Sequence, residues 1–207
     1  MADNINDLQG YPLFSFDFNW AATPSTRLAM PRYLHGFQGT SHYLETLENK
    51  NRLVFDAEVM LDSESDIDTF LDFVEDKMGI VNPFWVRHPF CYFQFETYPG
   101  AADTSLIYNY VNADDFLDNN NRLYIDLANG DTLAWKISNV LDSVVVDRTF
   151  ITIPKPIGRA LTSADVPFSG LLLFCRFGNK EFKLEYKRTR LASVKLKFVE
   201  LPQEVPA

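Results

Sequence analysis

The spacing of apolar residues constrains this chain more than any other feature of its sequence. Along most of the 207 residues, apolar and polar side chains alternate, which is the period of a strand with one buried face. Residues 52–61, "RLVFDAEVML", illustrate it, with Phe55, Ala57 and Val59 on one face. The period becomes helical over one stretch, residues 64–78. The sequence therefore predicts a mainly β fold with one flanking α-helix.

The helical stretch carries signals at both of its ends. Ser63 stands three residues before Asp66, as in a capping box, and acidic residues in the first turn suit the helix dipole. Gly79 stands where a left-handed residue would end the helix. Phe84 and Trp85, in the next strand, are expected to fill the space beneath it. The stripe expected to cover a sheet face is Ile67, Phe70, Leu71, Val74 and Met78.

Turn residues divide the rest of the chain into short strands. Asn129–Gly130, within "ANGD", is a strong signal for a two-residue hairpin turn. Pro83 and Pro89 cannot donate to a ladder, so their segment is expected to be an edge strand or to contain a bulge. Residues 21–50 have an irregular pattern, although 41–50 could be extended. The predicted strands are 12–20, 52–61, 82–97, 104–111, 122–127, 132–140, 143–147, 149–153, 170–177, 181–187 and 192–200.

The order of these strands predicts two domains. Residues 100–164 contain only short β segments and are expected to form a small inserted β-rich domain. Residues 1–99 and 165–207 are then expected to form one discontinuous β domain.

Composition excludes several protein classes. Hydrophobic residues make up 46% and aromatic residues 14%, which is too much apolar material for a disordered chain. No apolar run approaches the ~20 residues that span a bilayer, and the opening "MADNINDLQG" lacks the features of a signal peptide. The two cysteines, Cys91 and Cys175, fit a reducing compartment and are expected to be buried. We therefore expect folding in the cytoplasm and no membrane partner.

Charge is distributed unevenly along the chain. Residues 1–175 carry 11 basic and 24 acidic side chains, whereas residues 176–197 carry 8 basic and 2 acidic ones. The basic block alternates with apolar residues, which predicts two antiparallel strands joined at 188–191 with one solvated face. That face could instead meet an acidic surface of a neighbouring copy, whereas nucleic-acid binding lacks a supporting motif. The basic residues concerned are Lys183, Lys187, Arg188, Arg190, Lys195 and Lys197.

No constellation for catalysis or metal binding stands out. The three histidines, His35, His42 and His88, do not have metal-ligand spacing, and no phosphate-binding or nucleophile-elbow motif occurs. The acidic loop at 112–121 lacks the ligand order of a calcium-binding hand. The sequence therefore predicts a protein that is not an enzyme and has no catalytic, metal-binding or cofactor-binding residues.

Two segments carry a resemblance to a known family. Asp66–Phe73 followed by Gly79 to Trp85 resembles the helix-to-strand segment of tailed-phage distal tail proteins. The ending "RFGNKEFKLEYKRTRLASVKLKFVELPQEVP" at 176–206 is similar to the close of that family, with an Arg-Phe-Gly opening, two strands and a final "ELPxE". The resemblance covers residues 50–90 and 170–205, and the middle of the chain does not take part.

The resemblance implies a fold and a role. It implies a tail-tube-like split β-barrel or sandwich with one flanking helix, in a virion structural protein that forms a homohexameric ring at the tail tip or baseplate. The implied neighbours are the tail tube protein above and the tip hub protein below, with the genome leaving through the lumen without specific binding. The protein would assemble in the host cytoplasm and would then be located in the tail tip of the virion.

Two other functions remain open from the sequence. A carbohydrate-binding β-sandwich for receptor recognition would use exposed aromatic residues, and an enzyme that cuts glycosidic or cell-wall bonds would use a carboxylate pair. Nothing singles out one carboxylate pair among 28 acidic residues. The candidate sugar-stacking residues are Tyr92, Tyr98, Tyr108 and Tyr110.

Overall fold

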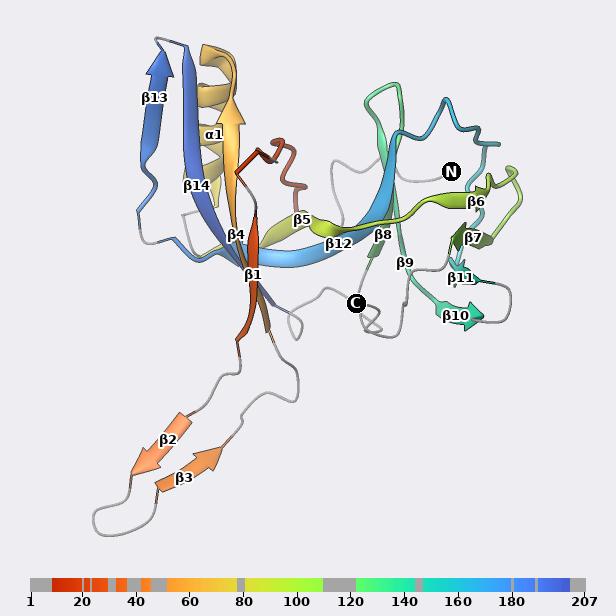
Figure 1. Ribbon diagram of the computed structural model, residues 1–207, viewed down its shortest axis with the longest axis horizontal. Coiled ribbons are helices and arrows are strands. Elements are labelled where there is room, and N and C mark those ends of the chain that lie inside the picture. The colour runs from red at the N-terminus through yellow and green to blue at the C-terminus, as the bar shows by residue number, and fades with distance from the viewer. Residues whose placement is uncertain are drawn as a thin grey trace. The chain divides into compact units, whose positions relative to one another are not determined.

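In the structure, a computed structural model, the chain folds into two compact units. The first unit comprises Met1–Phe14 and Trp85–Leu173, and the second comprises Ser15–Phe84 and Phe174–Ala207. Within the described part of the chain, the fold is mainly β with one helix, as the sequence predicts (Figure 1). The described residues are 9–19, 21–22, 24–29, 33–36, 42–45, 52–77, 81–109, 122–143, 147–179, 181–188 and 190–201.

An antiparallel sheet forms the second unit. β4 is its central strand and pairs with β1 on one side and with β14 on the other. β14 in turn pairs with β13 near its start and with the end of β12 near its own end. The predicted terminal hairpin is thus confirmed. The strands are β1 (Ser25–Ala29), β4 (Arg52–Leu61), β12 (Phe168–Phe177), β13 (Leu184–Arg188) and β14 (Leu191–Glu200).

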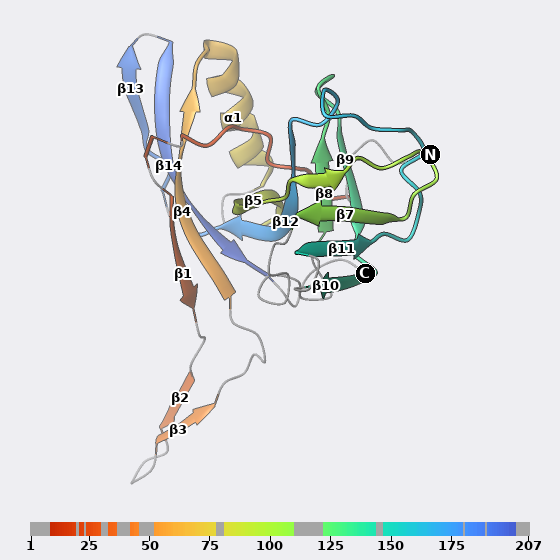
Figure 2. The ribbon, with the colours of Figure 1, turned by 45° about the vertical axis from the view of Figure 1, so that its right-hand side comes forward.

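The single described helix, α1 (Glu64–Asp76), lies along β4 and β14 (Figures 1 and 2). Ser63 is its N-cap, as predicted, because its hydroxyl accepts a hydrogen bond of 3.1 Å from the Asp66 backbone N–H. Lys77 is the C-cap, and the predicted stop at Gly79 lies outside the described residues.

Phenylalanine rings fill the space between α1 and the sheet. Phe55 stacks on Phe198 across β4 and β14, with ring centroids 4.8 Å apart. Phe73 of the helix meets Phe84 edge-on at 5.3 Å, and Phe84 lies 4.6 Å from Phe177. Such arrangements add specific ring contacts to the free energy of burial. The helix is therefore held by aromatic packing.

The packing around the helix differs from the prediction at two points, and the predicted stripe residue Met78 lies outside the described residues. Leu71 is 44% exposed, whereas Ile67 and Phe70 are buried. Phe84 lies against the helix residue Phe73, but Trp85 follows it directly in an extended strand and so points to the opposite side. The expectation that both residues fill the space beneath the helix is therefore wrong for Trp85.

A separate two-stranded hairpin lies between β1 and β4 in the chain. It consists of β2 (Tyr33–Gly36) and β3 (His42–Glu45), and among the described strands these pair only with each other. The sequence pattern at 21–50 indicated extended chain only at 41–50. β1 and β2 were missed because their residues do not alternate in polarity.

The first unit contains two groups of paired strands. One is a four-stranded antiparallel sheet in the order β10-β11-β7-β6 (Figure 2). In the other, β8 pairs with β9 and with β12, and β5 pairs with β12 alone among the described strands, as expected from Pro89. The strands are β5 (Phe84–Tyr92), β6 (Phe95–Thr97), β7 (Ser105–Asn109), β8 (Arg122–Asp126), β9 (Thr132–Lys136), β10 (Asn139–Ser143) and β11 (Arg148–Thr152).

The predicted turn between β8 and β9 is present. Gly130 has a backbone φ of 88°, a left-handed conformation that residues other than glycine rarely adopt. Gly170 on β12 is required for a different reason. A Cβ atom there would lie 2.2 Å from the carbonyl oxygen of Cys91, so only glycine allows β5 and β12 to approach this closely.

One hydrophobic core holds the first unit together. It joins residues of β5 and β6, such as Cys91 and Phe95, to residues of β7, β8, β9 and β11 and to Leu171 of β12. The boundaries expected at residues 99/100 and 164/165 both lie inside this unit, whereas the compact units separate at 84/85 and 173/174.

Candidate functional site

Carboxylates of β4 lie beside several residues of the predicted basic surface of the terminal hairpin. In the sheet register, Lys195 lies opposite Glu58, and Lys197 lies opposite Asp56. The Lys187 ammonium group is 3.7 Å from a Glu58 carboxylate oxygen. The hairpin therefore carries much less unpaired positive charge than its sequence suggests.

The remaining basic residues of the hairpin are exposed. Lys183 pairs with Glu185 at 3.5 Å, and Arg190 pairs with Glu64 at 4.0 Å. Exposed ion pairs of this kind contribute about 0–1 kcal/mol each to stability. They leave these side chains able to exchange partners.

β13 has an unusual exposure for a strand. Leu184 is half-buried, and the following residues, 185–188, are all exposed. Tyr186 is 61% exposed although it belongs to the side of the ladder that also carries buried Ala192. Because consecutive residues of a strand point to opposite faces, both faces of β13 are open. Its outer edge has no partner strand in the described part of the chain.

Beyond the end of β12, an asparagine side chain continues the hydrogen bonding to β14. Gly178 donates its backbone N–H to the Lys197 carbonyl at 2.6 Å. The Asn179 side chain then donates to the Lys195 carbonyl at 3.0 Å and accepts from the Lys197 N–H at 2.6 Å. Asn179 therefore satisfies backbone groups of β14 at the point where β12 has ended and β13 has not begun.

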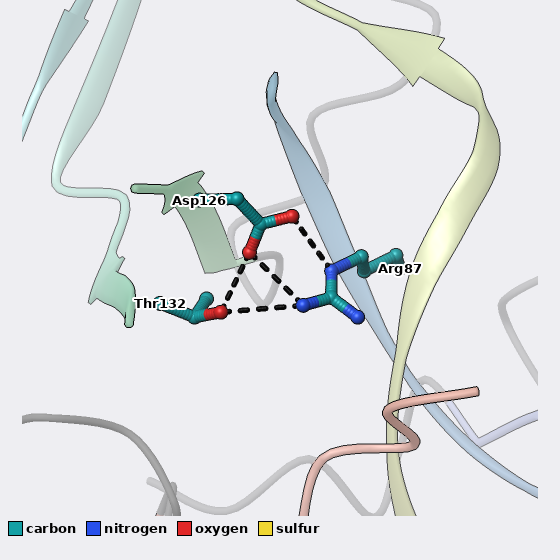
Figure 3. A network of polar contacts seen from close by, with 3 residues as sticks. All are labelled: Arg87, Asp126 and Thr132. Carbon is teal, nitrogen blue, oxygen red and sulfur yellow. Dashed lines mark hydrogen bonds and ion pairs between the residues drawn. The ribbon is translucent and has the colours of Figure 1, made fainter. Parts of the chain in front are cut away.

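A polar network links three strands of the first unit (Figure 3). The Arg87 guanidinium lies 2.9 Å from Asp126 through Nε and donates from Nη2 to Asp126 at 3.0 Å and to Thr132 at 3.2 Å. The Thr132 hydroxyl also donates to Asp126 at 2.6 Å. The Asp126 carboxylate thus contacts both Arg87 and Thr132. The network positions β5 on β8 and β9.

The candidate sugar-stacking tyrosines have different environments. Tyr92 is 46% exposed, and Tyr98 is half-buried. Tyr108 is fully buried and shares a hydrogen bond of 3.0 Å with the Ser169 hydroxyl, so it cannot contact an external ligand. Tyr110 lies outside the described residues.

Tyr92 has an aromatic neighbour that the sequence analysis missed. The ring of Phe168, which is 57% exposed, lies 6.0 Å from the ring of Tyr92. Both residues line a groove of about 400 Å³ together with Gln94, Tyr98 and Ser169. Phe168 follows Pro167 and precedes the predicted strand 170–177, and this position gave no signal that the ring would be exposed.

The structure describes the side chain of only one of the three histidines, His88. His88 is buried, and burial lowers its pKa to about 4, so the ring is neutral at pH 7. The side chains of His35 and His42 and the loop at 112–121 lie outside the described residues. A search of the described residues finds no group of three or more metal-ligating side chains.

Both cysteines are buried, as predicted. Burial raises the pKa of the Cys91 thiol to about 12 and also raises that of Cys175. Neither thiol is therefore ionised near neutral pH. A nucleophilic or redox-active cysteine must be ionised, because the thiolate is the reactive form.

None of the described helices is long and apolar enough to cross a membrane. No protein-family model matches the chain, and a comparison with curated proteins finds no match.

Proposed function

We propose that this protein is a structural ring subunit of a phage tail tip, in which the second unit supplies the tail-tube-like sheet. The observation that carries the proposal is β13, an edge strand that is open on both faces and along its outer edge. Such an edge is a template for pairing with a further strand. A partner strand would also cover the exposed Tyr186 side chain.

The sheet of the second unit has a second, different edge at β1. Among the described strands, β1 pairs with β4 alone. Contact of the β13 edge with the β1 edge of the next copy would be heterologous, and such contacts produce closed rings when the rotation between copies closes. Six copies would form the ring implied by the family resemblance, with the tail tube protein above and the tip hub protein below.

The outer sheet face of the second unit suits a lumen through which DNA passes. It carries Asp56 and Glu58 on β4 opposite Lys197 and Lys195 on β14. DNA affinity depends on unpaired basic side chains that neutralise phosphates, and here carboxylates face the lysines. The proposed ring therefore lets DNA pass without retaining it, and no enzymatic activity is assigned to it.

Proline substitutions test the edge contact. Backbone N–H groups of adjacent strand residues point to opposite edges, so one of Glu185→Pro and Tyr186→Pro removes a hydrogen bond to β14 and the other alters only the outer edge. We expect the variant that keeps the wild-type Tm to lose ring assembly in negative-stain images of concentrated protein. The proposal would be contradicted if tail particles contain the wild-type protein in any arrangement other than a ring around the tail axis.

Charge reversal tests the exposed basic residues. The triple variant Lys183→Glu, Arg188→Glu and Arg190→Glu alters side chains that are all exposed, so the monomer should fold normally. We expect weaker ring assembly at low salt and a smaller effect at high salt, because salt already screens the wild-type contact. If assembly does not respond to these charge reversals, the basic side chains do not contribute to the contact between copies, and the backbone edge of β13 forms it alone.

A further inference from the structure

The exposed aromatic pair of the first unit lies at a break between two strands. Tyr92 ends β5, and after Phe93 and Gln94 the chain continues as β6 in a different sheet. Phe93 donates its backbone N–H to the Ser169 carbonyl at 2.8 Å, and the Gln94 carbonyl accepts from the Asn109 N–H at 3.0 Å. These bonds hold the backbone of the break, so the groove beside it is already formed.

The groove offers flat apolar surfaces with hydroxyl and amide groups between them. The rings of Tyr92 and Phe168 are inclined at 55° to each other, so they present two different planes to a ligand. Tyr98 packs on Phe95 with ring centroids 5.4 Å apart, which holds a third ring in place. Gln94 and Ser169 also line the groove. Gln94 is exposed, and its amide can both donate and accept hydrogen bonds, whereas the Ser169 hydroxyl is buried and bonded to Tyr108.

The lining has a further property that restricts the ligand. None of the described residues that line the groove is charged. A polyanion such as nucleic acid needs basic side chains for its phosphates, and an acidic or basic peptide needs an opposite charge. The lining therefore selects a neutral ligand that has both apolar faces and many hydroxyl groups.

We propose that this groove binds a neutral saccharide, with Tyr92 and Phe168 as stacking platforms. The C–H face of a pyranose ring is apolar and fits an aromatic face, while its hydroxyl groups lie at the ring edge and can reach the exposed Gln94 amide. A groove of about 400 Å³ lies within the range of small-molecule sites and accommodates a short oligosaccharide. The site is independent of ring formation because all of its residues belong to the first unit.

A glycan array probed with the full-length protein, followed by titration with the neutral oligosaccharides that bind, tests this site. We expect Tyr92→Ala and Phe168→Ala each to weaken binding about tenfold or more, since each removes a stacking surface. Tyr92→Phe keeps the ring and should keep most of the affinity. Tyr186→Ala is the matched control, because it removes a similarly exposed tyrosine from the second unit.

Three results would overturn the proposal. One is the absence of binding to any neutral glycan on the array or to neutral hexasaccharides in solution at millimolar concentration. Another is binding that survives the double variant Tyr92→Ala and Phe168→Ala with unchanged affinity. The third is preference for a proline-rich peptide, which can also dock in aromatic grooves, over every saccharide tested. Because the assay needs no ring, its failure leaves the ring proposal unaffected.

Discussion

Glu58 on β4 lies directly opposite Lys195 on β14, in the centre of the second unit's sheet. A hydrogen bond with Ser193 is the main reason that the pKa of Glu58 is lowered, and Lys187, Asn19 and Lys195 lower it further. The Glu58 carboxylate on β4 thus interacts with Lys187 on β13 and Lys195 on β14, one residue from each strand of the hairpin. This arrangement explains why a strongly basic sequence segment does not form a free basic surface.

The Glu58–Lys195 relationship predicts a small energetic coupling. Oppositely charged residues directly across a sheet contribute about 0.2–1 kcal/mol relative to uncharged pairs. We expect the double-mutant cycle of Glu58→Gln and Lys195→Gln, measured by urea unfolding, to give a coupling in this range. The matched cycle of Glu58→Gln with Lys183→Gln should be additive, because no contact joins these two side chains among those described.

The helix predicts a strong contrast between its two faces. Phe70 is fully buried and meets Phe16 edge-on at 5.4 Å, so Phe70→Asp would bury a carboxylate among aromatic rings. The cost is several kcal/mol out of about 5–15 kcal/mol of domain stability, and we expect loss of soluble protein or a large fall in Tm. Asp72→Ala, on the exposed face, should melt close to wild type. Equal melting of both variants would show that the helix does not pack as described.

Two buried tyrosines of the first unit predict opposite effects of removing a hydroxyl. Tyr108 shares a hydrogen bond with Ser169, whereas the buried Tyr124 hydroxyl has no hydrogen-bond partner among the described residues. Tyr108→Phe should lose about 1 kcal/mol or more, because the buried Ser169 hydroxyl is left unpaired. Tyr124→Phe should be neutral or stabilising. Urea midpoints of the two variants decide this, and a larger loss for Tyr124→Phe would contradict the assignment.

Local signals in the sequence predicted the elements that depend on local chemistry. The alternation in residues 52–61 defined β4, the Ser63 hydroxyl defined the start of α1, and Asn129–Gly130 defined the β8–β9 turn. These features need only neighbouring residues, since a cap or a tight turn is formed within four residues of chain.

Features that depend on distant segments were missed or reversed. Leu71 fits the apolar stripe by spacing, yet it is exposed among the described residues, whereas Phe73 contacts Phe84 and Phe177. Tyr92 and Tyr108 both occur in alternating strands, and only the fold decides that Tyr92 is exposed and Tyr108 buried. The exposed side of a strand is set by which other strands cover it, and a single sequence does not contain that information.

His88 predicts a fall in stability in mild acid. Its pKa is about 4 in the folded protein and 6.5 in the unfolded chain, so between these values the unfolded chain binds more protons. Stability therefore decreases as the pH falls from 6.5 to 4, by up to about 3 kcal/mol. Urea midpoints at several pH values should show a shallower decrease for His88→Gln than for wild type. Parallel curves for the two proteins would show that His88 does not remain neutral in the fold.

The unit boundaries predict which deletion leaves a folded protein. The core of the first unit joins Cys91, Phe93 and Phe95 to residues of the segment 100–164, so replacing only that segment by a Gly/Ser linker would expose them. Replacing residues 85–173 instead removes all of the first unit except Met1–Phe14. Phe84 packs on Phe177, three residues beyond the other end of the gap, with ring centroids 4.6 Å apart, so a short linker closes the chain at little entropic cost.

We therefore expect the 85–173 replacement to give a soluble protein with cooperative thermal unfolding and the 100–164 replacement to aggregate. Circular dichroism and size-exclusion chromatography of the two products measure the difference. The opposite result, in which the 100–164 replacement folds and the 85–173 replacement does not, would contradict this expectation. It would mean that the strands within 100–164 form a domain of their own and that the second unit needs β5 and β12 along their whole length.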